Sequence, residues 1–301
     1  MRWEKLGRIL APDRRLKWMS TYTGAAFALL HEGTSLVDLY VTGRDDRNRS
    51  QIGIARVDLV HPTRVLDVTP EPVFTWGERG AFDENGVSYP WLVPDRDELF
   101  MFYVGWMPTV LAPFMVTLGM ARQRPDGTFC RVSRAPILPR TDEEPFSIGA
   151  ACVTLEEGLW RMWYTSFLRW GDSPSDHKHY YVIKYAESTD GRAWNRPNHT
   201  CIGFAGPGEY AISRPSVLRW NGAFHMWFST RGDQYRIGYA HSSDGLVWTR
   251  EASAGLDVSS SGWDSIAQCY AHVIAYGDDL YMFYNGNDYG REGLGIARLR
   301  R

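Results

Sequence analysis

The sequence predicts an all-β fold, a five-bladed β-propeller in which each blade is a sheet of four antiparallel strands. Three observations predict it. A short motif recurs five times along the 301 residues, an aromatic strand-like segment precedes each copy, and the N-terminal segment resembles the strand that the last unit lacks. Repeats of this length indicate propellers or solenoids. The alternative is an elongated solenoid of β-units, which would need capping repeats.

The recurring motif is a short segment around an alanine, seen in "SQIGIAR", "VTLGMAR", "YVIKYAE", "YRIGYAH" and "EGLGIAR". The alanines are spaced 66, 65, 54 and 57 residues apart, at Ala55, Ala121, Ala186, Ala240 and Ala297. Such intervals hold four strands of about five residues with their turns. The motif is therefore expected to form the third strand of each blade.

The strand before each motif is aromatic and β-branched, as in "LFMFYVGW" and "LYMFYNGN". In four units an apolar innermost strand begins thirteen residues before an aromatic residue of this second strand, with the pairs Pro90 and Tyr103, Ala151 and Tyr164, Pro215 and Phe228, and Ala271 and Tyr284. Fourth strands are expected in "TFCRV", "RAWNR" and "LVWTR", after Asp-Gly turns. The last unit lacks one, so "RWEKLGRIL" is expected to complete it and close a single domain over residues 1–301.

Composition narrows the classes of partner. The chain is 44% hydrophobic and 14% aromatic, and its net charge is −2. Because its Lys and Arg residues are scattered, neither nucleic acid nor a membrane is an expected partner. No segment is typical of a secretion signal or a membrane span, which favours a cytoplasmic location. The four cysteines are far apart in sequence and are expected to be free thiols. The sequence does not indicate an oligomeric state.

Acidic residues recur just before the innermost strands. Asp83, Glu144 and Asp264 each lie seven residues before the strand position defined above, and Glu209 lies six before it. The first unit has no acid there, but Asp45 ends its second strand. Because these segments open on the propeller face that carries the long loops, the carboxylates are expected to converge on one acidic central pocket.

Cationic and aromatic residues are expected around the same pocket. Alignment of the second strands puts Arg44, Trp106, Phe167, Arg231 and Asn287 at one position, and Tyr89, Arg214 and Tyr270 stand one residue before innermost strands. Trp170 begins a long loop. Aromatic rings offer flat surfaces to sugars, and arginine binds hydroxyls, carboxylates or phosphates. With two carboxylates held at a defined separation, the pocket could cleave a glycosidic bond.

The units "FDENGVSYPWLV", "LWRMWYTSF", "SRPSVL" and "WDSIAQCYAHV" resemble the five-bladed arabinanase, levansucrase, invertase and mannoside-phosphorylase group of glycosidases over nearly the whole chain. They are most similar to uncharacterised bacterial members associated with polysaccharide genes. The resemblance implies a propeller with a central acidic sugar pocket, and some relatives carry calcium or another ion on the axis. The acids of arabinanase-like members, however, usually stand where this chain has Tyr89, Ala150, Arg214 and Tyr270.

From position, Asp83 is therefore assigned as base or nucleophile, and Asp264 or Asp45 as the carboxylate that tunes the pKa of the acid and binds hydroxyls. Glu144 is assigned as general acid because the third blade supplies it in the resembled group. The residues assigned to substrate binding are Arg44, Asp45, Tyr89, Trp106, Trp170, Glu209, Arg214, Arg231, Tyr270 and Asn287. His177 and His179 lack a clear third ligand, so no metal or other cofactor is predicted from the residues.

Three functions remain open at this level. The first is a glycoside hydrolase acting on an oligosaccharide. The second is a phosphorylase or another enzyme acting on an anionic sugar, which is motivated by Arg44, Arg49, Arg214, Arg231 and Arg236. The third is a sugar-binding propeller without catalysis, which is motivated by the acids missing from the usual positions.

Overall fold

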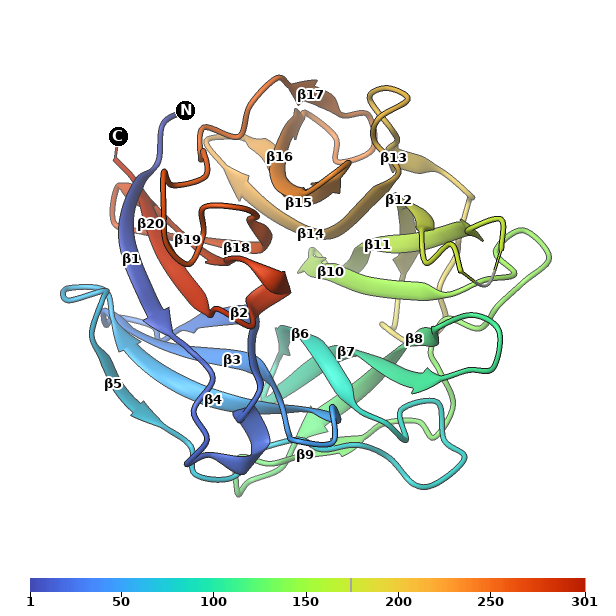
Figure 1. Cartoon of the computed structure of the whole chain (residues 1–301), viewed down its shortest axis with the longest axis horizontal. Helices are drawn as coiled ribbons and strands as arrows, with labels where there is room; N and C mark the ends of the chain where they lie inside the picture. Colours follow the sequence, from blue (N-terminus) through green and yellow to red (C-terminus); the bar gives the residue numbers. More distant parts are fainter. Residues whose placement is uncertain (174, 301) are drawn as a thin grey trace.

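A computed structural model describes residues 1–173 and 175–300 of the chain (Figure 1). The described part is all-β apart from two 3-10 turns, η1 (Lys17–Met19) and η2 (Asp288–Gly290). The strands are β1 (Glu4–Leu10), β2 (Tyr22–Leu30), β3 (Leu36–Arg44), β4 (Ser50–Asp58), β5 (Val65–Val68), β6 (Val87–Asp95), β7 (Glu98–Pro108), β8 (Phe114–Gln123), β9 (Phe129–Arg131), β10 (Ile148–Glu156), β11 (Leu159–Trp170), β12 (His179–Ser188), β13 (Thr200–Ile202), β14 (Ala211–Trp220), β15 (Ala223–Arg231), β16 (Tyr235–Ser242), β17 (Thr249–Glu251), β18 (Cys269–Tyr276), β19 (Asp279–Asn285) and β20 (Leu294–Leu299).

The strands form antiparallel sheets around a common centre (Figure 1). Three sheets have four strands, in the orders β2-β3-β4-β5, β6-β7-β8-β9 and β18-β19-β20-β1. A further sheet has eight strands, because a single parallel pairing between Tyr181 of β12 and Ala211 of β14 joins the group β10–β13 to the group β14–β17. The sheets therefore confirm a propeller-like all-β fold, and they do not by themselves confirm five separate blades.

The ring closes as the sequence predicts. β1 pairs antiparallel with β20, so the N-terminal strand supplies the outer strand of the last sheet. The innermost strands β2, β6, β10, β14 and β18 each pack against the next, and β18 packs against β2. One expected strand is wrong: "RAWNR" forms only an isolated bridge at Asn195, and the outer strand β13 follows it at Thr200–Ile202.

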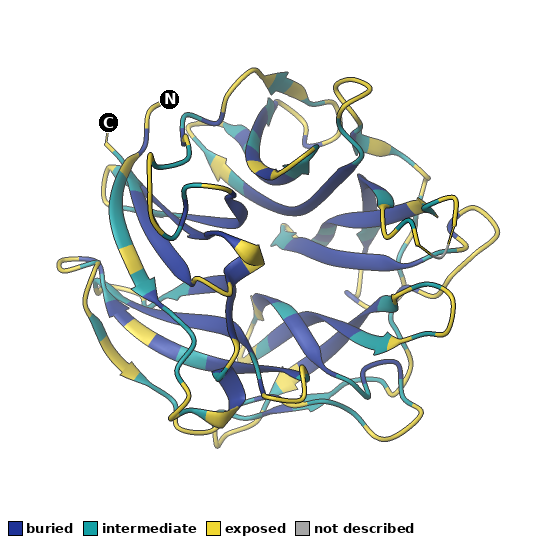
Figure 2. Ribbon diagram, in the orientation of Figure 1, coloured by how far each residue is buried: buried dark blue, intermediate teal, exposed yellow. Residues whose placement is uncertain are grey.

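The core lies between neighbouring sheets, where the predicted aromatic second strands are buried (Figure 2). Trp163, Trp227 and Phe283 are wholly buried, in the role that packed rings have between sheets. All four cysteines are free. None of the helical segments in the described chain is long and apolar enough to span a membrane.

Each innermost strand carries a β-bulge near its start. The register against the second strand shifts between Gly24 and Phe27 in β2, and at the corresponding place in β6, β10, β14 and β18. At four of these bulges one residue has a left-handed backbone: Ala25, Tyr89, Arg214 and Tyr270, with φ from 47° to 58°. This conformation is strained for residues with a Cβ and is typical of functional sites. The bulges aim these residues at the centre of the ring.

Candidate functional site

Three of the recurrent acids, Asp83, Glu144 and Asp264, are buried, and Glu209 is partly buried. Asp83 is fully buried, accepts a hydrogen bond from Tyr103 Oη at 3.1 Å, and forms an ion pair with Arg131 Nε at 2.7 Å. Tyr103 belongs to the second strand β7 and Arg131 to the outer strand β9. We call this set of acid, second-strand residue and cation a carboxylate clamp, because the acid ties the loop before the sheet to two of its strands.

Three further carboxylate clamps repeat the arrangement. Glu144 binds Tyr164 Oη at 3.0 Å, Ser166 Oγ at 2.6 Å and Arg196 Nη1 at 3.2 Å. Glu209 forms a two-point ion pair with Arg250, at 2.8 and 2.9 Å, and also binds Thr230. Asp264 binds Tyr284 Oη at 3.0 Å and Lys5 Nζ at 2.7 Å, and Lys5 comes from the closing strand β1.

In two of these clamps, hydrogen-bond partners stabilise the negative charge of the carboxylate. Burial alone would raise the pKa of Glu209, but hydrogen bonds from Arg250 and Thr230 outweigh it and lower the pKa below its usual value. Burial would likewise raise the pKa of Asp264, but hydrogen bonds from Lys5 and Ser259 outweigh the effect of burial and lower this pKa. Both carboxylates are therefore ionised at neutral pH, which suits an ion pair and not a proton donor.

The predicted convergence of the acids on a central pocket is not what the structure shows. None of Asp83, Glu144, Glu209 and Asp264 lines the central pocket formed by the described residues. Asp45 is also held away from it, by an ion pair with Arg49 at 2.8 Å. The physical reason is that each carboxylate is paired with a cation on a strand or connection of its own unit, instead of pointing across the ring toward the other acids.

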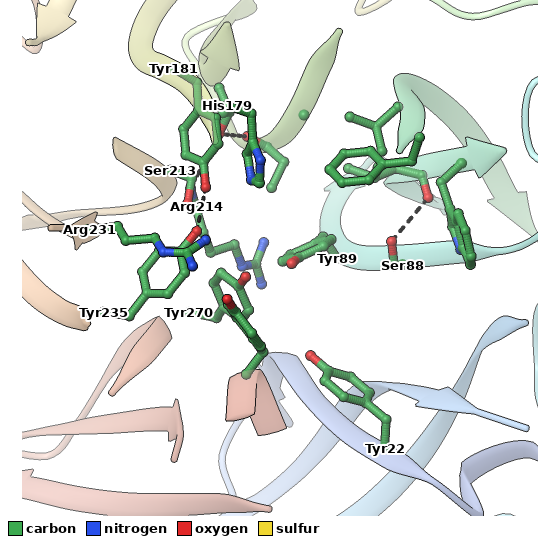
Figure 3. A pocket seen from close by; sticks show the side chains of 18 of the residues that line it. Tyr22, Ser88, Tyr89, His179, Tyr181, Ser213, Arg214, Arg231, Tyr235 and Tyr270 are labelled. Atoms are coloured by element: carbon green, nitrogen blue, oxygen red, sulfur yellow. Dashed lines mark hydrogen bonds between the residues drawn. The ribbon is translucent and has the colours of Figure 1, made fainter. Parts of the chain in front are cut away.

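The central pocket has a volume of about 550 Å³ and lies over the bulges of the innermost strands (Figure 3). Six of the predicted binding residues line it: Arg44, Tyr89, Trp106, Arg214, Arg231 and Tyr270. Trp170 lies beside it, packed on Phe114 and Phe167. Asn287 does not line it; its side chain accepts hydrogen bonds from the backbone N–H groups of Ile266 and Ala267. Tyr89, Arg214 and Tyr270 are the bulge residues. They stand at positions where the glycosidases that this chain resembles usually have acids, so two phenols and a cation replace acids there.

Arg214 lies wholly buried at the floor of the central pocket. Its Nη2 donates to the backbone oxygens of Ala26 at 2.9 Å and Pro90 at 3.3 Å, while Nε and Nη1 have no partner among the described residues. Burial lowers the pKa of Arg214 to about 10, so it stays charged at neutral pH, and the groups that act on its charge include no carboxylate. Burial of an ion without a counter-ion costs on the order of several kcal/mol, and for Arg214 the two carbonyl groups and the rings of Trp91 and Tyr89, at 5.5 and 5.9 Å, offset part of this cost.

Two further arginines face the pocket without acidic partners. Arg231 lies 5.1 Å from the Tyr235 ring and 5.5 Å from the Tyr289 ring, and the groups that shift its pKa upward against burial are tyrosines. Arg44 lies 5.0 Å from the Tyr22 ring, and its Nη1 donates to Asn48 at 3.1 Å. Cation–π contact with these rings holds both guanidinium groups in place. Nitrogen donors of these groups remain available to a ligand in the pocket.

Aromatic and neutral groups complete the lining. Tyr181 and Tyr235 are hydrogen-bonded through their hydroxyls (Figure 3), and burial raises the pKa of Tyr235 to about 12. Burial lowers the pKa of His179 below 6.5, so this imidazole is neutral at pH 7. Asp288, in η2, is the one carboxylate among the described lining residues. The pocket is therefore cationic and aromatic, which corrects the expectation of an acidic pocket.

Several lining residues escaped sequence reasoning, namely Tyr22, Tyr181, Tyr235, Asp288 and Tyr289. Tyr181 and Tyr235 begin two of the five recurring motifs, and this place in the motif was a usable signal. Within residues 1–173 and 175–300 no group of three or more His, Cys, Asp or Glu side chains is placed to hold an ion.

Comparison with known proteins identifies sequence relatives of this chain and solved structures that share its fold. No family model matches the chain. It is 38% identical to the uncharacterized proteins MT1551 and Rv1502 from two strains of Mycobacterium tuberculosis, over 300 residues and 99% of each chain.

Solved structures with the same fold include a BT0996 complex with RGII, at 17% identity and TM-score 0.76, covering 99% of this chain and 92% of that one. Another, described under "The GH130 family of mannoside phosphorylases contains glycoside hydrolases that target beta-1,2 mannosidic linkages in Candida mannan", has 14% identity and TM-score 0.74 over 99% and 93%. A thermostable family-43 glycoside hydrolase has 16% identity and TM-score 0.66 over 91% and 88%. The chain therefore belongs to the family of the uncharacterized M. tuberculosis proteins MT1551 and Rv1502, with the propeller-like fold of glycoside hydrolases.

Proposed function

We propose that the central pocket binds a sugar carrying an anionic group, a phosphate or a carboxylate. The observation that carries this proposal is Arg214, a fully buried guanidinium with two unpartnered nitrogen atoms and no carboxylate partner among the described residues. A buried positive charge in a low-dielectric floor raises the affinity of the cavity above it for anions. A neutral sugar offers only hydroxyl groups to this charge and would gain less from it than an anionic one.

Direct contacts would come from the arginines on the walls. Arg231 and Arg44 offer planar forks, which suit the two oxygens of a carboxylate or a phosphate. The tyrosine rings and Trp106 offer flat surfaces for the apolar face of a sugar ring. The cavity of about 550 Å³ is in the range of small-molecule sites.

Hydrolysis by a pair of carboxylates is less well supported. That mechanism needs two carboxyl groups about 5 to 10 Å apart on either side of the bond. Only Asp288 is available among the described residues that line the pocket. The assignment of Asp83, Glu144 and Asp264 to catalysis stays a prediction, and their ion pairs favour a structural role.

We also propose five blades in one domain over residues 1–301. The eight-stranded sheet then counts as two blades, β10–β13 and β14–β17, because one parallel residue pair joins them. The five innermost strands, each with a bulge at the same place, support this count.

The proposal predicts selective binding of anionic sugars that depends on Arg231. Isothermal titration would compare galacturonic acid with galactose, and glucose 1-phosphate with glucose. At least one anionic member should bind and its neutral partner should not, and Arg231→Met should weaken binding about 10- to 100-fold, since a hydrogen bond to a charged group contributes about 1.5–3 kcal/mol.

Arg122→Met is the matched control, because Arg122 pairs with Glu98 outside the pocket and should leave affinity unchanged. Equal binding of charged and neutral sugars, or an equal loss in both variants, would contradict the proposal.

A second candidate function is phosphorolysis of a glycoside, favoured by the single carboxylate among the described residues that line the pocket. In phosphorolysis a phosphate oxygen attacks the anomeric carbon, the glycosidic C–O bond breaks, and one acid protonates the leaving oxygen. Phosphate thus takes the place of one of the two carboxylates that hydrolysis needs. Asp288 would be the acid, and the arginines would bind phosphate.

This candidate predicts that a sugar 1-phosphate appears only when inorganic phosphate is present. With disaccharides as substrates, whose leaving sugar hydroxyl needs a proton, Asp288→Asn should lower the phosphate-dependent rate about 100-fold or more, within the range of general acid catalysis, and should leave sugar binding intact. Release of free sugars at the same rate without phosphate would exclude it.

A further inference from the structure

A second hollow lies beside the central pocket, between the hairpin β11–β12 and the loop before β14. It has a volume of about 710 Å³ and is lined by Arg169, Lys178, Tyr180, Phe204, Gly206, Pro207, Gly208, Glu209, Tyr210, Gly232 and Asp233. We call it the rim groove. Its walls come from three separate connections, so the groove depends on the folded ring and not on one loop.

The rim groove and the central pocket share their walls. Side chains alternate between the two faces of a strand. At the start of β12, His179 and Tyr181 accordingly face the pocket, while Tyr180 between them faces the groove. At the end of β15, Arg231 lines the pocket and the next residue, Gly232, lines the groove.

Arg231 connects the two hollows. Its guanidinium lies 5.5 Å from the ring of Tyr210 in the groove and 5.1 Å from the ring of Tyr235 in the pocket. An anionic group bound by Arg231 would therefore stand on the boundary. A sugar unit linked to the one in the pocket would extend over Tyr210.

The groove has the surfaces that a sugar unit uses. Tyr180 and Tyr210 lie with ring centroids 5.7 Å apart, and Phe204 is 38% exposed, which is unusual for phenylalanine. Arg169 covers the Tyr180 ring at 3.6 Å and fixes it. Glu209 is not free to act there, because its carboxylate is held by Arg250. The available surface is aromatic, with the cations Arg169 and Lys178 and the acid Asp233 at its edge.

We propose that the rim groove is a second sugar subsite, which binds the neighbouring unit of an oligosaccharide whose anionic unit occupies the central pocket. The proposal rests on the proposed function and narrows its ligand from a single anionic sugar to a chain of two or more units. Stacking on Tyr210 and Phe204 supplies the added affinity, and Arg231 sets the position of the chain.

The test compares ligands that differ by one unit. Isothermal titration would use galacturonic acid against its dimer and trimer, and glucose 1-phosphate against maltose 1-phosphate. In the series that binds, the longer ligand should bind about tenfold more tightly than the single unit, since tenfold corresponds to about 1.4 kcal/mol. Phe204→Ala should remove most of this gain without weakening the single unit. Tyr210→Ala should also remove most of the gain, measured as the ratio of the affinities of the longer and the single ligand, because the Tyr210 ring also contacts Arg231. Tyr276→Ala, at the end of β18, is the matched control.

The outcomes separate this proposal from the one on which it rests. If the single unit binds through Arg231 but a longer ligand gains nothing, or if its gain survives in both Tyr210→Ala and Phe204→Ala, the rim groove is not a subsite and the proposed function stands. If no anionic sugar binds in an Arg231-dependent way, the proposed function fails, and the subsite fails with it.

Discussion

Arg131→Met is expected to lower the free energy of unfolding by about 3–5 kcal/mol, the usual cost of removing one partner of a buried ion pair. Arg131 is the cation of the carboxylate clamp of Asp83, whose carboxylate is fully buried; Arg131 and Tyr103 both bind its Oδ2, and its Oδ1 has no hydrogen-bond partner among the described residues. Without Arg131 the carboxylate keeps only Tyr103 and must stay charged in a dry site or take up a proton.

Urea denaturation of the wild type and the variant measures this loss. Arg134→Met is the matched control, because the ion pair between Arg134 and Glu78 is exposed and should contribute little. The double variant Arg131→Met with Asp83→Asn should recover part of the lost stability, since it removes the uncompensated charge. If Arg131→Met instead left stability unchanged and abolished sugar binding or turnover, the clamp would be a functional site.

Arg214→Met is expected to have the opposite profile, with a large loss of binding and a small change in stability. Loss of the buried charge should weaken binding of an anionic sugar about 100-fold or more, on the scale of buried charged groups at binding sites. The hydrogen bonds to Ala26 and Pro90 are also lost, but relief of the desolvated charge offsets that cost. Residues that serve function often lower stability in this way.

Thermal unfolding measures the expected small change in stability, and isothermal titration of the same preparations measures the expected loss of sugar binding. Arg214→Lys keeps the charge without the planar fork and should retain part of the affinity. A fall in unfolding temperature as large as that of Arg131→Met, with unchanged affinity, would show that Arg214 is a structural residue.

The sequence predicted the ring and its closure because repetition reveals architecture directly. It also placed Tyr89, Arg214 and Tyr270 correctly in the central pocket, since the bulge falls at the same register in successive innermost strands. What a sequence pattern conveys well is therefore the position of a residue along the blade.

The direction of a side chain was harder to predict. Asp83 and Glu144 occupy the expected positions, but register alone does not say whether a carboxylate points into the ring or back into its sheet. The signal was present in the spacing, because Asp83, Glu144 and Asp264 each bind a tyrosine twenty residues later. A constant separation between an acid and a tyrosine in three of the repeats is typical of a structural pair.

Asp288 and the paired hydroxyls of Tyr181 and Tyr235 were missed for another reason. Asp288 has φ 50° in a short turn of the last loop, which no other blade repeats in the described part of the chain. Tyr181 and Tyr235 belong to the neighbouring strand groups β10–β13 and β14–β17, and they meet only when these two groups pack together. The contact between the two hydroxyls depends on tertiary structure, and the sequence shows only that both tyrosines begin copies of the recurring motif.

The most direct test of an anion-binding pocket is a crystal structure of the protein with glucose 1-phosphate or galacturonic acid bound. We predict that the phosphate or carboxylate oxygens lie within hydrogen-bond distance of Arg231 or Arg44, above Arg214, with the sugar ring against the pocket tyrosines. A sugar bound instead with its anomeric carbon against Asp83, Glu144 or Asp264, or with its anionic group in solvent away from the arginines, would contradict the proposal.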